Sequence, residues 1–94
     1  MQDSGILVLN SGSTSLKFAL YQVQQSKLSV VAQGGFIAMP NAATLVINDS
    51  NGVRLVDLQF VGEQVNHEIA LDKLLAILRQ KFSRLNIAYA GHRI

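Results

Sequence analysis

The sequence predicts an α/β fold in which a mixed sheet of about five to six strands carries one main helix on one face. Three observations support this class. Short apolar runs bounded by Gly, Asn and Ser fill the first 60 residues, as in strands joined by turns. A helical period then begins at Asn66, and an apolar strand-like run returns at residue 87.

The first three strands follow from local patterns. Residues 6–9 are continuously apolar, which is typical of a strand buried on both faces. Apolar and other residues alternate over residues 16–21, which indicates a second strand. Residues 28–32 read as a third strand, and we expect Gly34 and Gly35 to break it or to mark a bulge.

A loop and a hairpin come next. Residues 36–43 contain Pro40 and are expected to form a loop. Two further strands are predicted over residues 44–48 and 53–60. The intervening Asp-Ser-Asn-Gly run ends in Asn-Gly, which supplies the positive φ angles that tight hairpin turns need.

The helix has the clearest boundaries in the sequence. Apolar residues follow helical spacing as far as Leu85, Asn66 is a suitable N-cap, and Glu68 lies in the first turn. We expect Asn86 to end the helix and residues 87–90 to form the last strand. Three cations lie in the last turns of the helix, where they complement the helix dipole: Arg79, Lys81 and Arg84.

Composition narrows the possible functions. The 94 residues allow one small domain, and 49% hydrophobic content is too high for a disordered segment. The net charge is only +2, and the cations of the helix end complement the helix dipole, so a solvated helix end is favoured over a nucleic-acid site. There is no cysteine, no run long enough to span a membrane and no basic signal-peptide region. A cytoplasmic location without membrane or nucleic-acid partners is therefore expected.

The run Asn-Ser-Gly-Ser-Thr-Ser-Leu-Lys, residues 10–17, has the features of an anion site. A buried strand delivers small residues and hydroxyls to a tight turn, whose N–H groups can line a concave anion site. The amide of Asn10 can face a hard cation, and Lys17 offers a positive charge to phosphate. Such turns also occur where they only close a hairpin. The run over residues 10–17 is not a Walker A loop, because the spacing between its glycine and the lysine is wrong and a strand follows instead of a helix.

These residues resemble the N-terminal signature of the acetate kinase family, in which Asn, Gly and a run of Ser precede Leu-Lys. A second match stands at the other end of the chain, where Gly91-His92-Arg93-Ile94 resembles the start of the family's Gly-His-Arg segment. Thr14 stands where serine is usual. The resemblance implies that residues 1–94 are an incomplete N-terminal portion of the first actin-like (ribonuclease H-like) kinase domain. The abrupt end after a strand agrees with a cut chain.

The resemblance also implies roles for individual residues. Asn10 matches the asparagine associated with Mg²⁺, Lys17 the lysine associated with ATP phosphates, and Arg93 the arginine that holds the acid or acetyl phosphate. Arginine suits that role because its guanidinium pairs with carboxylate or phosphate oxygens. Ser13 and Ser15 either donate to phosphate or only close the turn. We expect Asn10, Lys17 and Arg93 to meet at the mouth of the first hairpin.

Two histidines are interpreted differently. His92 either positions the neighbouring arginine or is a structural core residue, and the structural role is favoured. His67 is interpreted as a surface residue at the start of the helix. No residue of this chain is singled out as catalytic, because the resemblance places the remaining acidic and charge-stabilising groups beyond Ile94.

Two hypotheses for function follow. The first is part of an ATP-dependent kinase that converts acetate, or a similar short-chain acid such as butyrate or propionate, to an acyl phosphate and ADP. The second is a non-catalytic binding module that keeps the phosphate hairpin. The resemblance implies ATP and Mg²⁺ as cofactors, and acetate or acetyl phosphate and ADP as further ligands. It also implies a homodimer when full length. Alone, the chain is expected to bind ATP weakly, to be inactive and to self-associate.

Overall fold

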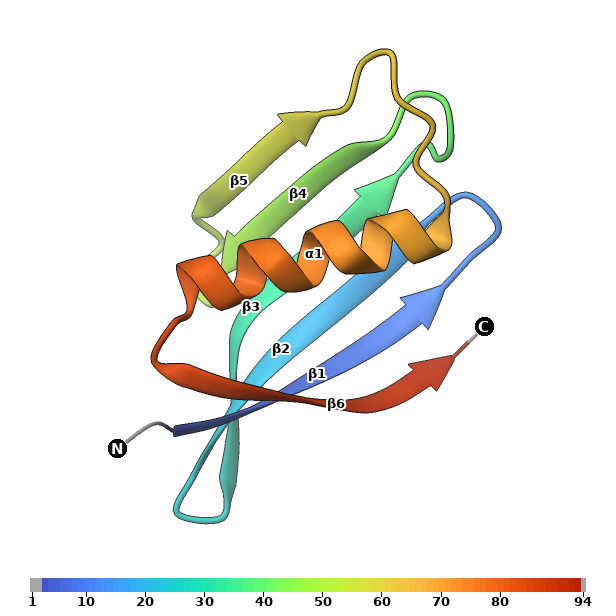
Figure 1. Cartoon of the computed structure of the whole chain (residues 1–94). Coiled ribbons are helices and arrows are strands. Elements are labelled where there is room, and N and C mark those ends of the chain that lie inside the picture. Colours follow the sequence, from blue (N-terminus) through green and yellow to red (C-terminus); the bar gives the residue numbers. More distant parts are fainter. Residues whose placement is uncertain (1–2, 94) are drawn as a thin grey trace.

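The computed structural model describes residues 3–93, with side chains for residues 3–88. Within that part, a six-stranded mixed sheet has the spatial order β5-β4-β3-β2-β1-β6, and one helix, α1, lies across one face (Figure 1). This confirms the predicted fold class. The elements are β1 (Asp3–Ser11), β2 (Leu16–Gln24), β3 (Lys27–Ile37), β4 (Thr44–Asp49), β5 (Arg54–Gln59), α1 (His67–Lys81) and β6 (Leu85–Arg93).

The connection through α1 brings the first and last strands of the chain together. Strands β1 to β5 form an antiparallel meander, so each strand pairs with the next one in sequence. The helix then carries the chain back across the sheet, and β6 pairs in parallel with β1 (Figure 1). The first and last strands of the chain therefore lie side by side, and both end near the β1–β2 turn.

Alternating side chains build one hydrophobic core between the sheet and α1. In β1, Leu7 and Leu9 are fully buried beneath the helix, whereas Val8 between them is 39% exposed. The expected burial of this strand on both faces is therefore wrong for this chain, because α1 covers only one face. The largest fully buried side chains are Phe36, Leu7, Leu9, Leu16, Leu20, Leu45, Ile47, Leu74, Leu78 and Val65.

Strand β3 neither breaks nor bulges at Gly34 and Gly35, contrary to the expectation from the sequence. Strand β3 continues through both glycines. Its irregularity lies earlier, where its pairing with β2 shifts register between Leu20 and Tyr21 of β2. A Cβ added to Gly34 would lie 2.0 Å from the carbonyl oxygen of Val46, so only glycine lets β4 approach this closely. The glycines permit close strand pairing instead of ending the strand.

The predicted hairpin between β4 and β5 is confirmed. The carboxylate of Asp49 accepts hydrogen bonds from the N–H groups of Asn51 and Val53, both at 2.9 Å, and Gly52 adopts a positive φ of 82°. The loop before β4 is also found, although it starts later than expected because β3 continues to Ile37. The Asp49 side chain thus fixes the turn that the Asn-Gly pair completes.

Helix α1 begins as predicted and ends earlier. The Asn66 side chain caps it by accepting from the N–H of Ile69 at 2.8 Å. The helix ends at Lys81, because the next residue, Phe82, has non-helical backbone angles (φ −119°, ψ 53°). The Leu85 N–H then donates to the Phe82 carbonyl at 2.9 Å and closes a turn before β6 begins at Leu85. Leu85 and Asn86, expected in the helix, are therefore strand residues. The last strand is longer than residues 87–90.

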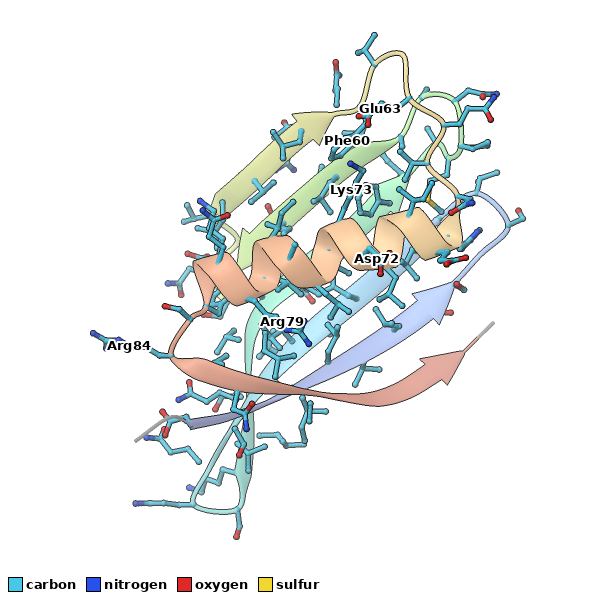
Figure 2. All side chains as sticks on the ribbon, in the orientation of Figure 1. Phe60, Glu63, Asp72, Lys73, Arg79 and Arg84 are labelled. Carbon is cyan, nitrogen blue, oxygen red and sulfur yellow. The ribbon has the colours of Figure 1, made fainter. Side chains whose placement is uncertain are left out.

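Charged and aromatic contacts tie the outer side of α1 to the segment that precedes it. Figure 2 shows Lys73 directed from the helix toward Phe60 and Glu63. Its ammonium lies 4.9 Å from the centre of the Phe60 ring and 3.7 Å from the Glu63 carboxylate. The ring of Phe60 also packs 5.5 Å from that of Phe36, so these contacts continue into the core. The described part of the chain holds no helix with the length and apolar character needed to cross a membrane.

Candidate phosphate-binding turn

The turn between β1 and β2 is tight and anchored by its carbonyl groups. The Gly12 N–H donates to the Ser15 carbonyl at 2.9 Å, and the Thr14 carbonyl accepts from the Met39 N–H at 3.0 Å. A Cβ added to Gly12 would lie 2.7 Å from the Ser15 hydroxyl oxygen, so glycine lets the turn fold over that side chain. Ser13 is exposed and Ser15 half-buried. The two serines therefore occupy different positions, with Ser13 at the surface and Ser15 beneath Gly12.

Asn10 and Lys17 occupy matching positions on the two strands that the turn connects. They are direct partners in the antiparallel register of β1 and β2, and both are exposed. Their neighbours Leu9 and Phe18 are buried beneath α1. Since side chains alternate across a strand, Asn10 and Lys17 project together from the face of the sheet opposite the helix.

Strand β6 brings Arg93 into the same row. In the parallel pairing of β6 with β1, Arg93 lies opposite Asn10. This position depends on a register shift: β1 advances two residues between Leu7 and Leu9 while β6 advances three. Without that extra residue, His92 would lie opposite Asn10. Bulges beside functional sites commonly re-aim residues in this way.

The backbone register brings Asn10, Lys17 and Arg93 to neighbouring positions at this end of the sheet. Their expected roles at a common site stay predictions. The side chains of His92 and Arg93 lie outside the described ones. The structural role favoured for His92 therefore stays a prediction. The register shift in β6 could not be predicted from the sequence, because it depends on pairing with β1 from the other end of the chain.

His67 is not the simple surface residue that the sequence suggested. It is the first residue of α1 and is only partly exposed, and its Nε2 lies 2.6 Å from the Gly12 carbonyl oxygen and 3.1 Å from that of Ser15. Figure 1 shows the start of α1 beside the β1–β2 turn. Sequence reasoning missed this contact because its acceptors are backbone carbonyls, which every residue type provides.

The described side chains provide few ligands for a metal ion. Among residues 3–88, no three His, Asp or Glu side chains gather closely enough to hold one. The amide oxygen of Asn10 is a hard ligand of the kind that Mg²⁺ accepts, and Mg²⁺ commonly takes its remaining ligands from waters and substrate phosphates. Asn10 therefore fits as one contact to a metal that arrives with a nucleotide. A separate surface hollow, lined by Asn41, Thr44 and Phe60 among others, contains none of the predicted site residues.

Comparison with known proteins matches this chain to one family. Residues 5–94 match the model of the acetokinase family. The chain is 28% identical over 91 residues to an acetate kinase of Rhodopseudomonas palustris, covering 95% of this chain and 23% of that protein. An acetate kinase of Borrelia garinii is 32% identical over 94 residues, and the match covers 95% of this chain and 22% of that protein.

A solved structure extends the likeness to three dimensions. The crystal structure of Porphyromonas gingivalis acetate kinase matches with a TM-score of 0.72 and 31% sequence identity, covering 97% of this chain and 23% of that one. The likeness confirms that the mixed sheet and its helix belong to the predicted actin-like fold. The chain spans about 23% of the length of the first curated relatives it matches. From the family match and this structural likeness, the chain belongs to the acetokinase family.

Proposed function

We propose that this chain is the N-terminal part of an acetate kinase, and that residues 1–94 form a portion of its first actin-like domain. The observation that carries the proposal is the single row formed by Asn10, Lys17 and Arg93 beside the β1–β2 turn. In a member of the acetokinase family, this row combines groups suited to a nucleotide phosphate and to an acid.

The proposed reaction transfers the γ-phosphoryl group of ATP to a short-chain carboxylate. A carboxylate oxygen attacks the γ-phosphorus, the bond from that phosphorus to the β-phosphate oxygen breaks, and ADP leaves with an acyl phosphate remaining. Such transfer depends mainly on positioning and on neutralising charge over the phosphoryl oxygens. Lys17 supplies a cation to the phosphates, and the N–H groups and hydroxyls of Ser13 and Ser15 supply further donors.

Arg93 holds the acid in this proposal. A guanidinium is always charged and offers paired donors that match two carboxylate or phosphate oxygens. Its backbone position opposite Asn10, one strand away from the phosphate turn, supports this role. Asn10 would hold Mg²⁺ or its water shell. When bound, Mg²⁺ supplies positive charge that screens the phosphate oxygens.

The remaining features of the proposal concern the whole protein. Its ligands are ATP and ADP with acetate or acetyl phosphate, it acts in the cytoplasm, and it works as a homodimer. Which acid this protein prefers is open to direct test.

The test is an acid panel on the full-length gene product. Purified protein is incubated with ATP, Mg²⁺ and acetate, propionate or butyrate, and acyl phosphate and ADP are measured separately. We expect the highest kcat/KM with acetate. Highest activity with butyrate or propionate would assign the protein to a sibling kinase. ATP binding without acyl phosphate formation would instead identify a non-catalytic module and refute the proposal.

A further inference from the structure

His67 makes a contact that joins α1 to the phosphate turn. Its Nε2 lies within hydrogen-bond distance of two carbonyl oxygens, those of Gly12 at 2.6 Å and Ser15 at 3.1 Å. Carbonyl oxygens only accept hydrogen bonds, so Nε2 must carry a proton and donate to both. The contact is partly buried on the Ser15 side and spans 52 residues of sequence, so it is a tertiary tie.

The helix itself does not need this contact. Its N-terminus is already capped by Asn66, whose side chain accepts from the Ile69 N–H at 2.8 Å. The ring of His67 therefore serves the turn and not the helix end. The turn has a second anchor in the Met39 N–H, which donates to the Thr14 carbonyl at 3.0 Å.

Fixing a carbonyl also fixes the next amide. In a planar trans peptide the C=O and N–H groups point in opposite directions. Because His67 holds the Gly12 carbonyl on the helix side, the Ser13 N–H points away from α1. That is the direction of the sheet face that carries Asn10 and Lys17. The Met39 contact with Thr14 directs the Ser15 N–H away from Met39 by the same geometry.

We propose that His67 is a positioning residue: it holds the β1–β2 turn so that the Ser13 amide is presented to a phosphate oxygen on the Lys17 side. The inference rests on the proposed phosphoryl-transfer function and adds to it a residue from outside the signature motifs. Preorganised hydrogen-bond donors are effective because they need not be reoriented when the phosphate binds.

The first test compares three variants of the full-length gene product. His67→Phe keeps a flat ring and removes the donor, His67→Gln restores an amide donor near Nε2, and Asn66→Ala weakens the same helix end without touching the turn. We expect His67→Phe to lose roughly 10- to 100-fold in kcat/KM for ATP, as displaced site groups typically do. His67→Gln should recover most of that loss, and Asn66→Ala should stay near the wild-type value at a temperature where all four proteins are folded. Equal kinetics of His67→Phe and Asn66→Ala would overturn the proposal.

The second test reads the turn directly and needs no activity. In deuterated, ¹⁵N-labelled protein, the Ser13 N–H should show a rigid order parameter of about 0.85, falling toward about 0.6 in His67→Phe and unchanged in Asn66→Ala. An equally rigid Ser13 in His67→Phe would refute positioning by His67 even if the wild type is an active kinase. An inactive wild type that keeps a rigid Ser13 dependent on His67 would refute the proposed kinase function while supporting the role of His67 in ordering the turn.

Discussion

In the proposed function, two residues at the β1–β2 end of the sheet bind different substrates. Lys17, which adjoins the turn, contacts the nucleotide phosphates, whereas Arg93, which lies on β6, holds the acid. Changing one group should therefore affect one substrate more than the other.

Arg93→Ala in the full-length protein should lower kcat/KM for acetate by about 100-fold, the size of effect seen when a charge-stabilising donor is removed. Nucleotide binding should stay nearly intact, because Lys17 and the turn are unchanged. Steady-state kinetics with acetate and with ATP varied separately make the measurement. Arg84→Ala removes an exposed cation in the turn after α1 and serves as the control. Unaltered acetate kinetics in Arg93→Ala would show that another group holds the acid.

Glycine is needed at Gly35 for a reason that lies in the fold. Its φ is +149°, and an added Cβ would lie 2.2 Å from the Leu16 carbonyl oxygen and 2.7 Å from the Lys17 Cα. Gly35→Ala should therefore push β3 away from β2 and lower the free energy of unfolding by more than about 2 kcal/mol. Urea denaturation of the 94-residue chain measures the change.

Gly62→Ala is the matched control for this substitution. Gly62 also has a positive φ, +79°, but an added Cβ would meet nothing within 4 Å. It should lower the free energy of unfolding by only about 1–2 kcal/mol, the conformational term alone. Equal effects of the two substitutions would mean that the close approach of β2 and β3 at Gly35 does not limit stability.

Residues with local chemical signatures were predictable at the site, and residues defined by contacts were not. Asn10 and Lys17 stand out in the sequence because a short polar run between two strands carries them together. His67 has no comparable signal, since its two acceptors are backbone oxygens more than 50 residues away. The register shift that places Arg93 opposite Asn10 depends likewise on the partner strand.

At the scale of elements, boundaries were predicted best where a side chain defines them. Asn66 starts α1 with its own hydrogen bond, and Asp49 fixes the β4–β5 turn. The end of α1 was placed too late because Phe82 and Leu85 continue the helical spacing while their backbone groups close a turn. Gly34 and Gly35 suggested a break because the close approach of β2 and β4 could not be known from β3 alone.

The β2–β3 turn carries strain that substitution can relieve. Gln25 and Ser26 have positive φ angles of 51° and 66°, a conformation that hairpins of this length favour but that these residue types adopt reluctantly. Replacing the pair by Asn-Gly should raise the free energy of unfolding by about 1 kcal/mol, the relief at two such positions less the greater flexibility of glycine. Thermal and urea unfolding of the 94-residue chain measure this.

A second turn distinguishes relief of strain from a general effect of glycine. Ser50, in the β4–β5 turn, does not have a positive φ, so Ser50→Gly should be neutral or lower the free energy of unfolding by up to about 1 kcal/mol. No stabilisation by Asn-Gly at the β2–β3 turn, or equal stabilisation by Ser50→Gly, would contradict this account of the strain.

At the scale of the whole molecule, the sheet is covered on one face only. Helix α1 crosses one side, and Figure 1 shows no element of the described chain on the other. Apolar side chains on that open face remain exposed, among them Val8 at 39% and Ile37 at 48%. Strands β5 and β6 also end the sheet with unpaired backbone edges within the described chain.

These exposed groups predict how the 94-residue chain behaves in solution. Exposed apolar patches and open strand edges both promote association. We therefore expect the apparent mass from light scattering to rise with protein concentration. A lysine substitution at Ile37 should shift that rise to higher concentration, because charge on the open face opposes a second copy.

Val61→Lys tests whether the open face is responsible. Val61 is 85% exposed but lies in the loop after β5, away from the sheet face. Its substitution adds the same charge to the protein and should leave association nearly unchanged. If Val61→Lys were as effective as the substitution at Ile37, net charge and not the uncovered face would control association. A monomer at every concentration would show that one helix is enough to protect this sheet.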